Sequence, residues 1–118
     1  MELYGAVEAG GTKIIAAIGR AGEEPLALER IPTTDPRETL DRVIGFFRTR
    51  TVEGYPIRAL GVACFGPVDL DPASPGWGFI TSTPKLRWQG TDVAGTLGRA
   101  LGVPVGFDTD VNAAALAE

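Results

Sequence analysis

The sequence predicts an α/β fold, built as a mixed five-stranded sheet with helices on its faces. Three observations lead to this prediction. Three short apolar segments near the N-terminus are joined by short polar or glycine-rich turns, which is typical of an antiparallel meander. Two segments with helical spacing of apolar residues then alternate with two further apolar segments, as in βαβ crossovers. The near-continuous apolar run Ile57–Phe65 is typical of a central strand that is covered on both faces.

The first two strands are predicted over Leu3–Glu8 and Thr12–Gly19. Gly10 and Gly11 lie between them and indicate a hairpin, because a tight primed turn needs positive φ at its central residues. A carboxylate, a hydroxyl and an ammonium group flank this turn, from Glu8, Thr12 and Lys13. Two interpretations stay open on spacing alone: a plain hairpin with polar neighbours, or a turn that holds phosphate.

The middle of the chain continues the pattern. Leu26–Ile31 is predicted as a third strand at the edge of the sheet. A helix follows, with Asp35 as its N-cap and Pro36 at its first position. Its apolar face is formed at helical spacing by Leu40, Val43, Ile44 and Phe47.

The strand Ile57–Phe65 ends at Gly66-Pro67, and ligands of open α/β sheets bind beyond such strand ends. The following segment, Val68–Lys85, is rich in proline and glycine, so we expect a long irregular loop. A second helix is predicted from about Asp92 to Leu101, capped by Thr91 or Asp92 and ended by Gly102. A last strand over Pro104–Phe107 and an alanine-rich helix from Val111 complete the order.

Composition limits the classes of function. The chain has 118 residues, of which 44% are hydrophobic and 22% charged, as in an ordinary globular domain. The net charge of −4 disfavours nucleic acid as a partner. Without histidine, and with Cys64 as the single cysteine, the chain cannot form a Cys/His zinc site or use a histidine base. We expect a cytoplasmic protein, because no disulfide, signal peptide or membrane span is evident.

Three segments resemble one family, in the same order along the chain. Glu8–Lys13 resembles the first phosphate motif of the ROK sugar kinases, which belong to the actin-like ATPase superfamily. Gly61–Asp69 looks like their central strand and the sugar-site turn, and Asp108–Leu116 looks like the segment with their catalytic aspartate. Thr81–Lys85, together with Trp88 and Asp92–Gly95, is similar to the fructokinase branch. The resemblance implies a ribonuclease H-like (actin-like ATPase) domain.

The resemblance also implies roles for individual residues. Asp110 matches the catalytic base, although a helix N-cap is the simpler interpretation from the sequence alone. ATP phosphates would bind at the glycine turn, and Glu8 would hold Mg²⁺ through water. The implied phosphate-binding residues are Gly10, Gly11, Thr12 and Lys13. The implied sugar-binding residues are Gly66, Pro67, Thr83, Pro84, Lys85, Asp110 and Asn112. Trp77 and Trp88 either cover the sheet edge or stack on sugar.

The resemblance implies that residues 1–118 are the N-terminal, ATPase-like domain of a two-domain sugar kinase. The second domain would bind zinc and adenosine and is absent here, so we expect the chain alone to be inactive. The full protein would transfer the γ-phosphoryl of ATP to a hexose, with D-fructose giving fructose 6-phosphate, and a homodimer is possible. The alternative is a sugar- or phosphate-binding module related to ROK transcriptional regulators, without catalysis. A Rossmann domain is excluded, because the glycines join strand to strand.

Overall fold

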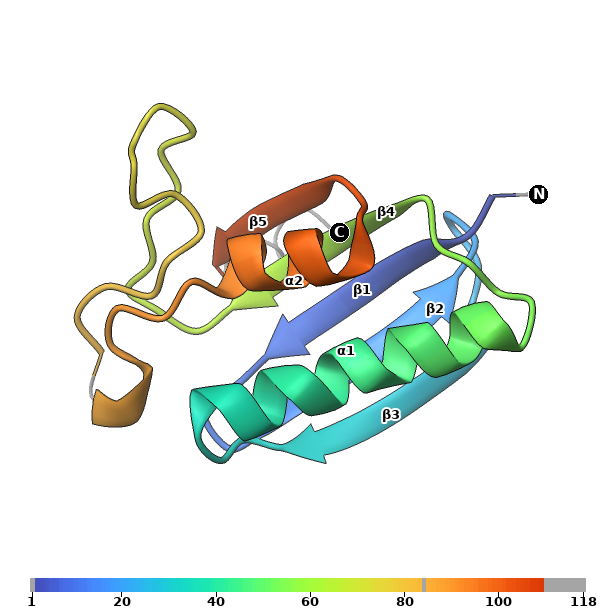
Figure 1. Cartoon of the computed structure of the whole chain (residues 1–118), viewed down its shortest axis with the longest axis horizontal. Helices are drawn as coiled ribbons and strands as arrows, with labels where there is room; N and C mark the ends of the chain where they lie inside the picture. The colour runs from blue at the N-terminus through green and yellow to red at the C-terminus, as the bar shows by residue number, and fades with distance from the viewer. Residues whose placement is uncertain (1, 84, 110–118) are drawn as a thin grey trace.

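The computed structural model describes residues 2–83 and 85–109. Five strands form one sheet in the order β3-β2-β1-β4-β5 (Figure 1). They are β1 (Tyr4–Ala9), β2 (Lys13–Gly19), β3 (Ala27–Pro32), β4 (Ala59–Cys64) and β5 (Val105–Thr109). The first three strands are antiparallel, whereas β1, β4 and β5 run parallel. The predicted mixed five-stranded sheet is therefore confirmed, with β1 at its centre.

Helices α1 (Pro36–Val52) and α2 (Val93–Leu101) cover one face of the sheet (Figure 1). Strand residues alternate between buried and more exposed, and the buried ones, such as Val7, Ile14 and Leu60, form the core with both helices. The Arg48 guanidinium joins the helices by donating to the carbonyl of Ala100 (3.2 Å). Within the described residues, neither helix has the length and apolarity that a bilayer crossing requires. Both described helices thus lie on the same face, and the helix predicted from Val111 lies outside the described residues.

The opposite face of the sheet carries mostly small or polar side chains along its inner strands. These side chains belong to Ala6, Glu8, Ile15, Ala17, Gly61 and Ala63. No described helix covers them (Figure 1). This surface is called the open face below. It ends, at the carboxyl ends of β1 and β4, beside the glycine turn.

Both helices begin at the aspartates that the sequence offers as caps. The Asp35 carboxylate accepts the amide of Glu38 (3.0 Å) at the start of α1. The Asp92 carboxylate accepts the amide of Gly95 (2.9 Å) at the start of α2, so Asp92 rather than Thr91 is the N-cap. Gly102 ends α2 with a φ of 67°, a left-handed conformation that favours glycine. The two aspartate contacts satisfy amides that a helix leaves unpaired at its N-terminus.

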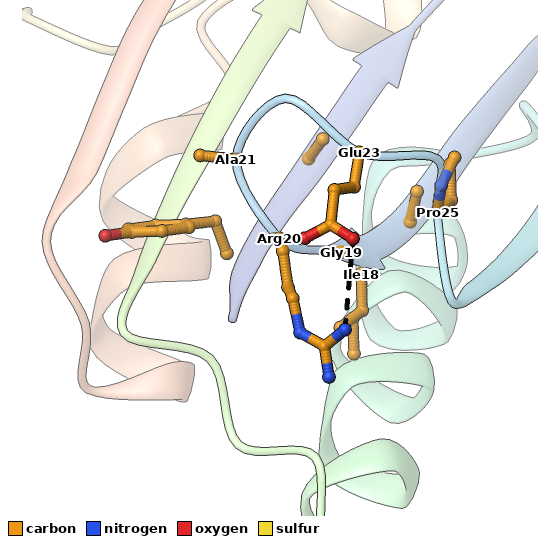
Figure 2. A pocket seen from close by; sticks show the side chains of 10 residues that line it. Ile18, Gly19, Arg20, Ala21, Glu23 and Pro25 are labelled. Atoms are coloured by element: carbon orange, nitrogen blue, oxygen red, sulfur yellow. Dashed lines mark ion pairs between the residues drawn. The ribbon is translucent and has the colours of Figure 1, made fainter. Parts of the chain in front are cut away.

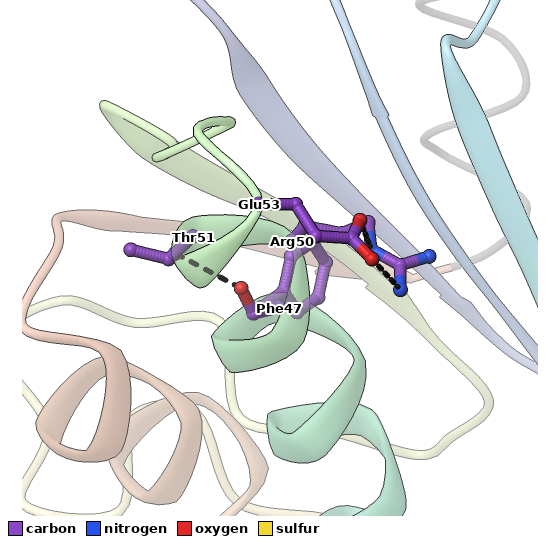
Figure 3. Close-up of polar contacts among 4 residues, drawn as sticks. All are labelled: Phe47, Arg50, Thr51 and Glu53. Carbon is purple, nitrogen blue, oxygen red and sulfur yellow. Dashed lines mark hydrogen bonds and ion pairs between the residues drawn. The ribbon is translucent and has the colours of Figure 1, made fainter.

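The end of α1 is fixed by local contacts (Figure 3). The Arg50 Nε lies 2.8 Å from a carboxylate oxygen of Glu53, just beyond the last residue of α1. The same guanidinium sits 5.3 Å from the centre of the Phe46 ring. The Thr51 hydroxyl donates to the carbonyl of Phe47 (2.9 Å), one turn earlier. These residues stabilise the last turn of α1, and they lie far from the glycine turn in sequence.

The predicted irregular loop, Val68–Lys85, is part of a longer irregular segment formed by residues 65–83 and 85–92, and backbone bridges hold this segment in place. Val68 pairs with Ile80, and Phe79 pairs with Asp92, through isolated antiparallel bridges. The carbonyl of Gly78 accepts the amides of Val93 and Ala94, so the loop also contacts the start of α2. A short 3₁₀ turn, η1 (Leu86–Trp88), precedes α2.

Candidate functional site

The turn between β1 and β2 is closed by one hydrogen bond, in which the Gly10 amide donates to the carbonyl of Lys13 (2.9 Å). Gly11 and Thr12 therefore form its tip. Neither Gly10 nor Gly11 is among the residues with positive φ. The expectation that this turn needs positive φ at its two glycines is therefore wrong. Their lack of a side chain has another use, because it leaves space around the turn.

The space differs between the two glycines. A Cβ on Gly10 would lie 3.0 Å from the carbonyl oxygen of Lys13, whereas a Cβ on Gly11 would meet no atom within 4 Å. The amides of Gly11 and Thr12 have no acceptor within residues 2–83 and 85–109. A hollow of about 160 Å³ lies here, lined by Glu8, Ala9, Gly10, Thr12, Lys13 and Ile15. The turn thus has two amides without an acceptor in the described residues beside a hollow that Thr12 lines, and backbone amides of this kind can bind phosphate oxygens.

Thr33, which follows β3 directly, forms two hydrogen bonds with the glycine turn. Its hydroxyl donates to the carbonyl of Gly10 (2.9 Å), and its amide donates to the carbonyl of Thr12 (2.9 Å). The next residue, Thr34, bonds through its amide to the hydroxyl of the buried Thr39 in α1 (2.9 Å). The glycine turn is thereby attached to the first turn of α1.

The charged residues that the sequence assigns to this site lie on the open face. Glu8 pairs with Ala63 of β4, and Ala63 pairs with Asp108 of β5, so the three lie in one row across the sheet. Two strand spacings put the backbones of Glu8 and Asp108 about 10 Å apart, with only a methyl group between them. Lys13 is exposed and alternates with the buried Ile14, which puts it on the same face as Glu8. Lys13 therefore lies on the side of the sheet that carries the carboxylates.

The second predicted segment, Gly66-Pro67, follows β4 at the same edge of the sheet. The amide of Phe65 donates to the carbonyl of Ala9 (2.9 Å), which holds the ends of β1 and β4 together. The Gly66–Pro67 peptide bond is cis. Thr81 binds the Pro67 carbonyl twice, through its amide (2.8 Å) and its hydroxyl (3.0 Å). Thr81 therefore joins the two segments that the sequence assigns to sugar.

The third predicted segment lies partly within the described residues. Thr83 is buried, and its hydroxyl accepts the amide of Lys85 (3.3 Å). The Thr83 carbonyl accepts the side-chain amide of Gln89 (3.3 Å). Pro84, Asp110 and Asn112 lie outside the described residues. The backbone of β5 reaches Thr109, so the segment that begins at Asp110 follows the strand beside β4.

The two tryptophans differ in burial. Trp88 is only 1% exposed, donates its indole N–H to the carbonyl of Thr34 (2.9 Å) and packs edge-on against Phe65. It is a core residue, so the sugar-stacking alternative is wrong for Trp88. Trp77 is half-buried and packs edge-on against Phe107, with ring centres 6.0 Å apart.

Sequence reasoning missed Thr33, and it included Thr81 in the fructokinase-like segment without giving it a role in the site. Both are single threonines in turn or loop segments, and no local pattern marks them. Their importance comes from contacts with Gly10 and Pro67, which lie 23 and 14 residues away along the chain. For Thr81 the available signal was its position just before Thr83–Lys85, which the sequence assigns to sugar, whereas Thr33 adjoins no assigned segment along the chain.

A second hollow, of about 230 Å³, lies at the opposite end of the β1–β2 hairpin (Figure 2). Arg20 and Glu23 flank it with their charged groups 4.0 Å apart. Nearby, the Glu2 carboxylate accepts the hydroxyl of Tyr4 (2.9 Å), and this hydrogen bond raises the pKa of Tyr4 above its usual value. These groups lie away from the carboxyl ends of β1 and β4, so they take no part in the site at the glycine turn.

A model of the ROK family matches residues 4–118. The chain belongs to the ROK family. The match includes the glycine turn, the end of β4 and the segment after β5. The ROK assignment therefore rests on nearly the whole chain, including each segment that carries the predicted site.

Known relatives agree with this assignment. The chain is 47% identical to a fructokinase of Zymomonas mobilis, over 99% of this chain and 39% of that protein. It is 41% identical to a fructokinase of Lactococcus lactis, over 98% of this chain and 38% of that protein. Its fold matches a ROK family glucokinase from Streptomyces griseus, solved with glucose and AMPPNP, with a TM-score of 0.78 and 25% identity over 96% of this chain and 35% of that one. The chain thus spans less than two-fifths of the length of these relatives.

Proposed function

We propose that this chain is the N-terminal part of an ATP-dependent hexose kinase that transfers the γ-phosphoryl of ATP to a sugar hydroxyl, with D-fructose as the substrate. One observation carries the proposal. Because β1, β4 and β5 are parallel neighbours, the glycine turn, Gly66-Pro67 and the segment after Thr109 start from the same edge of the sheet. Ligands of open α/β sheets bind beyond such an edge. We choose fructose over other hexoses as the acceptor because two relatives of this chain are fructokinases.

The glycine turn would bind the phosphates of ATP. Its two unused amides, of Gly11 and Thr12, supply donors, and the missing Cβ of Gly11 lets the phosphate approach the backbone. The amide of Gly10 already donates within the turn, so Gly10 contributes shape rather than a donor. Lys13 adds a positive charge on the open face, on the same side as Glu8.

A magnesium ion would neutralise charge on the phosphates during transfer. The residues present fit such an ion. Glu8 and Asp108 offer carboxylate oxygens, which Mg²⁺ prefers, on the two sides of Ala63. Mg²⁺ also keeps several of its waters, so a single carboxylate such as Glu8 can hold it through water. Among the residues described, no three acidic or sulfur ligands gather into a closed metal site.

The sugar would bind beside Gly66, Pro67 and the segment that includes Thr83, Pro84 and Lys85. Asp110 would accept the proton of the attacking hydroxyl, and Asn112 would help to bind the sugar. A carboxylate in this role orients the hydroxyl, while most of the rate acceleration comes from positioning and electrostatics. The single described cysteine, Cys64, is buried, which suits the reducing and ATP-rich cytoplasm as the place of reaction.

The proposal is tested on the full-length protein that contains this chain. Formation of ADP is measured with ATP, Mg²⁺ and one of fructose, mannose or glucose. We expect hexose-dependent turnover with the highest kcat/KM for fructose. The Asp110→Asn variant is expected to lower kcat by about 10²- to 10⁴-fold, since proton transfer by a positioned base supplies that much.

Asp41→Asn is the matched control, because Asp41 is exposed on α1 and the change removes the same charge. It is expected to leave kcat unchanged. ADP formation without any dependence on hexose would contradict the proposal, as would full activity of Asp110→Asn. The 118-residue chain by itself is expected to show no turnover, because the second domain is needed to complete the site.

A further inference from the structure

The Thr33 hydroxyl acts on one particular peptide bond. The carbonyl of Gly10, which accepts this hydroxyl at 2.9 Å, belongs to the same planar unit as the amide of Gly11. In a trans peptide the C=O and N–H groups point in opposite directions. A hydroxyl that holds the Gly10 carbonyl on the side of Thr33 therefore directs the Gly11 N–H to the opposite side, away from Thr33.

We propose that Thr33 is a positioning residue that orients the Gly11 amide toward the phosphates of ATP, and this inference rests on the proposed function of the turn. The glycine turn has few other restraints. A glycine pair has wide conformational freedom, and a Cβ built on Gly11 would meet no atom within 4 Å, so no packing restrains this residue. We call the hydrogen bond from the Thr33 hydroxyl to the Gly10 carbonyl the tether. An amide that is oriented before phosphate binds loses less conformational entropy on binding, so the tether increases the affinity for phosphate.

The support for Thr33 is itself rigid. Thr33 is half-buried, and its neighbour Thr34 is held at both its amide and its carbonyl. The Thr34 amide donates to the buried Thr39 hydroxyl, and the Thr34 carbonyl accepts the indole of Trp88. The tether therefore connects the turn to α1 and to the core, rather than to another mobile loop.

Thr33 holds the turn through two bonds, and only one depends on its side chain. The backbone bond from the Thr33 amide to the Thr12 carbonyl survives any non-proline substitution. Thr33→Val keeps the shape and the backbone bond and removes only the hydroxyl. Thr33→Ser restores the hydroxyl, so it is the rescue variant.

The experiment compares these two variants in the full-length protein, with KM for ATP, KM for the hexose and kcat as readouts. For Thr33→Val we expect KM for ATP to rise about tenfold, because a hydrogen bond to a charged phosphate is weakened. KM for the hexose is expected to stay within about twofold of the original value, since a misdirected Gly11 amide affects phosphate alone. Thr33→Ser is expected to keep all three constants within about twofold.

Thr51→Val is the matched control. It removes a hydroxyl that also donates to a backbone carbonyl at 2.9 Å, at the far end of α1 (Figure 3). It is expected to leave both KM values unchanged. An unchanged KM for ATP in Thr33→Val would overturn the inference, and so would an equal rise in Thr33→Ser or in Thr51→Val.

Amide hydrogen exchange, measured without nucleotide, tests whether the Thr33 hydroxyl stabilises the turn, independently of catalysis. The Gly10 amide, which closes the turn, is expected to exchange several times faster in Thr33→Val than in Thr33→Ser. Equal exchange in the two variants would overturn the tether. A wild-type protein that phosphorylates no hexose would instead contradict the proposed function, while the exchange measurement would still test the role of Thr33.

Discussion

The indole N–H of Trp88 donates to the carbonyl of Thr34 at 2.9 Å, across 54 residues of sequence. This bond joins η1, which follows the segment assigned to sugar, to the loop that holds the glycine turn. Trp88 also packs against Phe65, at the end of β4. One buried side chain therefore contacts both the loop that supports the glycine turn and the end of the strand that leads into Gly66-Pro67.

Removal of this indole donor is expected to lower the free energy of unfolding. Trp88→Phe leaves the Thr34 carbonyl without its partner and leaves a void in the core. We expect a loss of about 2–4 kcal/mol in the free energy of unfolding, from the unpaired carbonyl and the cavity together. Urea unfolding measures this loss. The same substitution at the half-buried Trp77 is the control, with an expected loss below about 1 kcal/mol, and an equal loss at both sites would contradict the prediction.

Gly5 allows a close approach between β1 and α1. A Cβ at this position would lie 2.8 Å from Leu60 and Phe47 side-chain atoms and 2.9 Å from Ile57. Gly5→Ala is expected to destabilise the fold by about 1–3 kcal/mol through overpacking, measured as a shift in the unfolding midpoint.

Gly61 provides the contrast for Gly5. It lies in β4, paired with Ala6, and a Cβ there would meet no atom within 4 Å. Gly61→Ala is expected to be neutral or to stabilise by up to about 1 kcal/mol, because alanine restricts the unfolded chain. A destabilisation equal to that of Gly5→Ala would show that the open face is more tightly packed than these distances indicate.

The cap of α2 combines a hydrogen bond and an ion pair. Asp92 accepts the Gly95 amide at 2.9 Å, and its other oxygen lies 3.1 Å from Arg99. Asp92→Ala is expected to cost about 1–2 kcal/mol of stability, whereas Asp92→Asn keeps the cap and should cost less than about 1 kcal/mol. Thermal unfolding at low and high salt separates the two terms, because salt screens only the ion pair. Equal losses in both variants would mean that the charge, and not the cap, stabilises α2.

Gly11 offers a substitution that separates binding from folding. Because a Cβ there meets no protein atom, Gly11→Ala should change the free energy of unfolding by less than about 0.5 kcal/mol. The added methyl group would occupy the space through which we propose that phosphate approaches, so KM for ATP in the full-length protein is expected to rise at least about tenfold. Gly106→Ala, at another exposed glycine with free space, is the control and should leave KM for ATP unchanged. An unaltered KM for ATP in Gly11→Ala would argue against phosphate at this turn.

Much of the fold follows from local pattern. The alternation of buried residues in β1 and β2, the capping aspartates and the helical spacing of α1 are all periodic or short-range signals. They placed the strands and helices within one or two residues of the observed bounds. The apolar run that becomes β4 also predicted its position inside the sheet, between β1 and β5.

The remaining features depend on contacts between distant segments. The glycine pair predicted a hairpin, yet local sequence shows neither its φ values nor its contact with Thr33, which lies 23 residues from Gly10 at the end of β3. Trp88 was ambiguous because an indole suits both a core and a sugar surface, and its burial together with its bond to Thr34 distinguishes them. Of the assigned site residues, Asp110 and Asn112 lie outside the described residues, so their roles rest on the resemblance alone.

The central position of β1 also sets an order of events during synthesis. The glycine turn and its tether lie within the first 33 residues, so both can form as soon as β3 leaves the ribosome. At that stage one edge of β1 is still unpaired, because its parallel neighbour β4 ends only at Cys64. An unpaired strand edge can pair with another chain and so favours misassembly. Helix α1 is synthesised after β3 and before β4, while this edge is still open. The glycine turn, to which we assign the phosphates of ATP, is therefore made before Gly66-Pro67 and the other segments that we assign to the sugar.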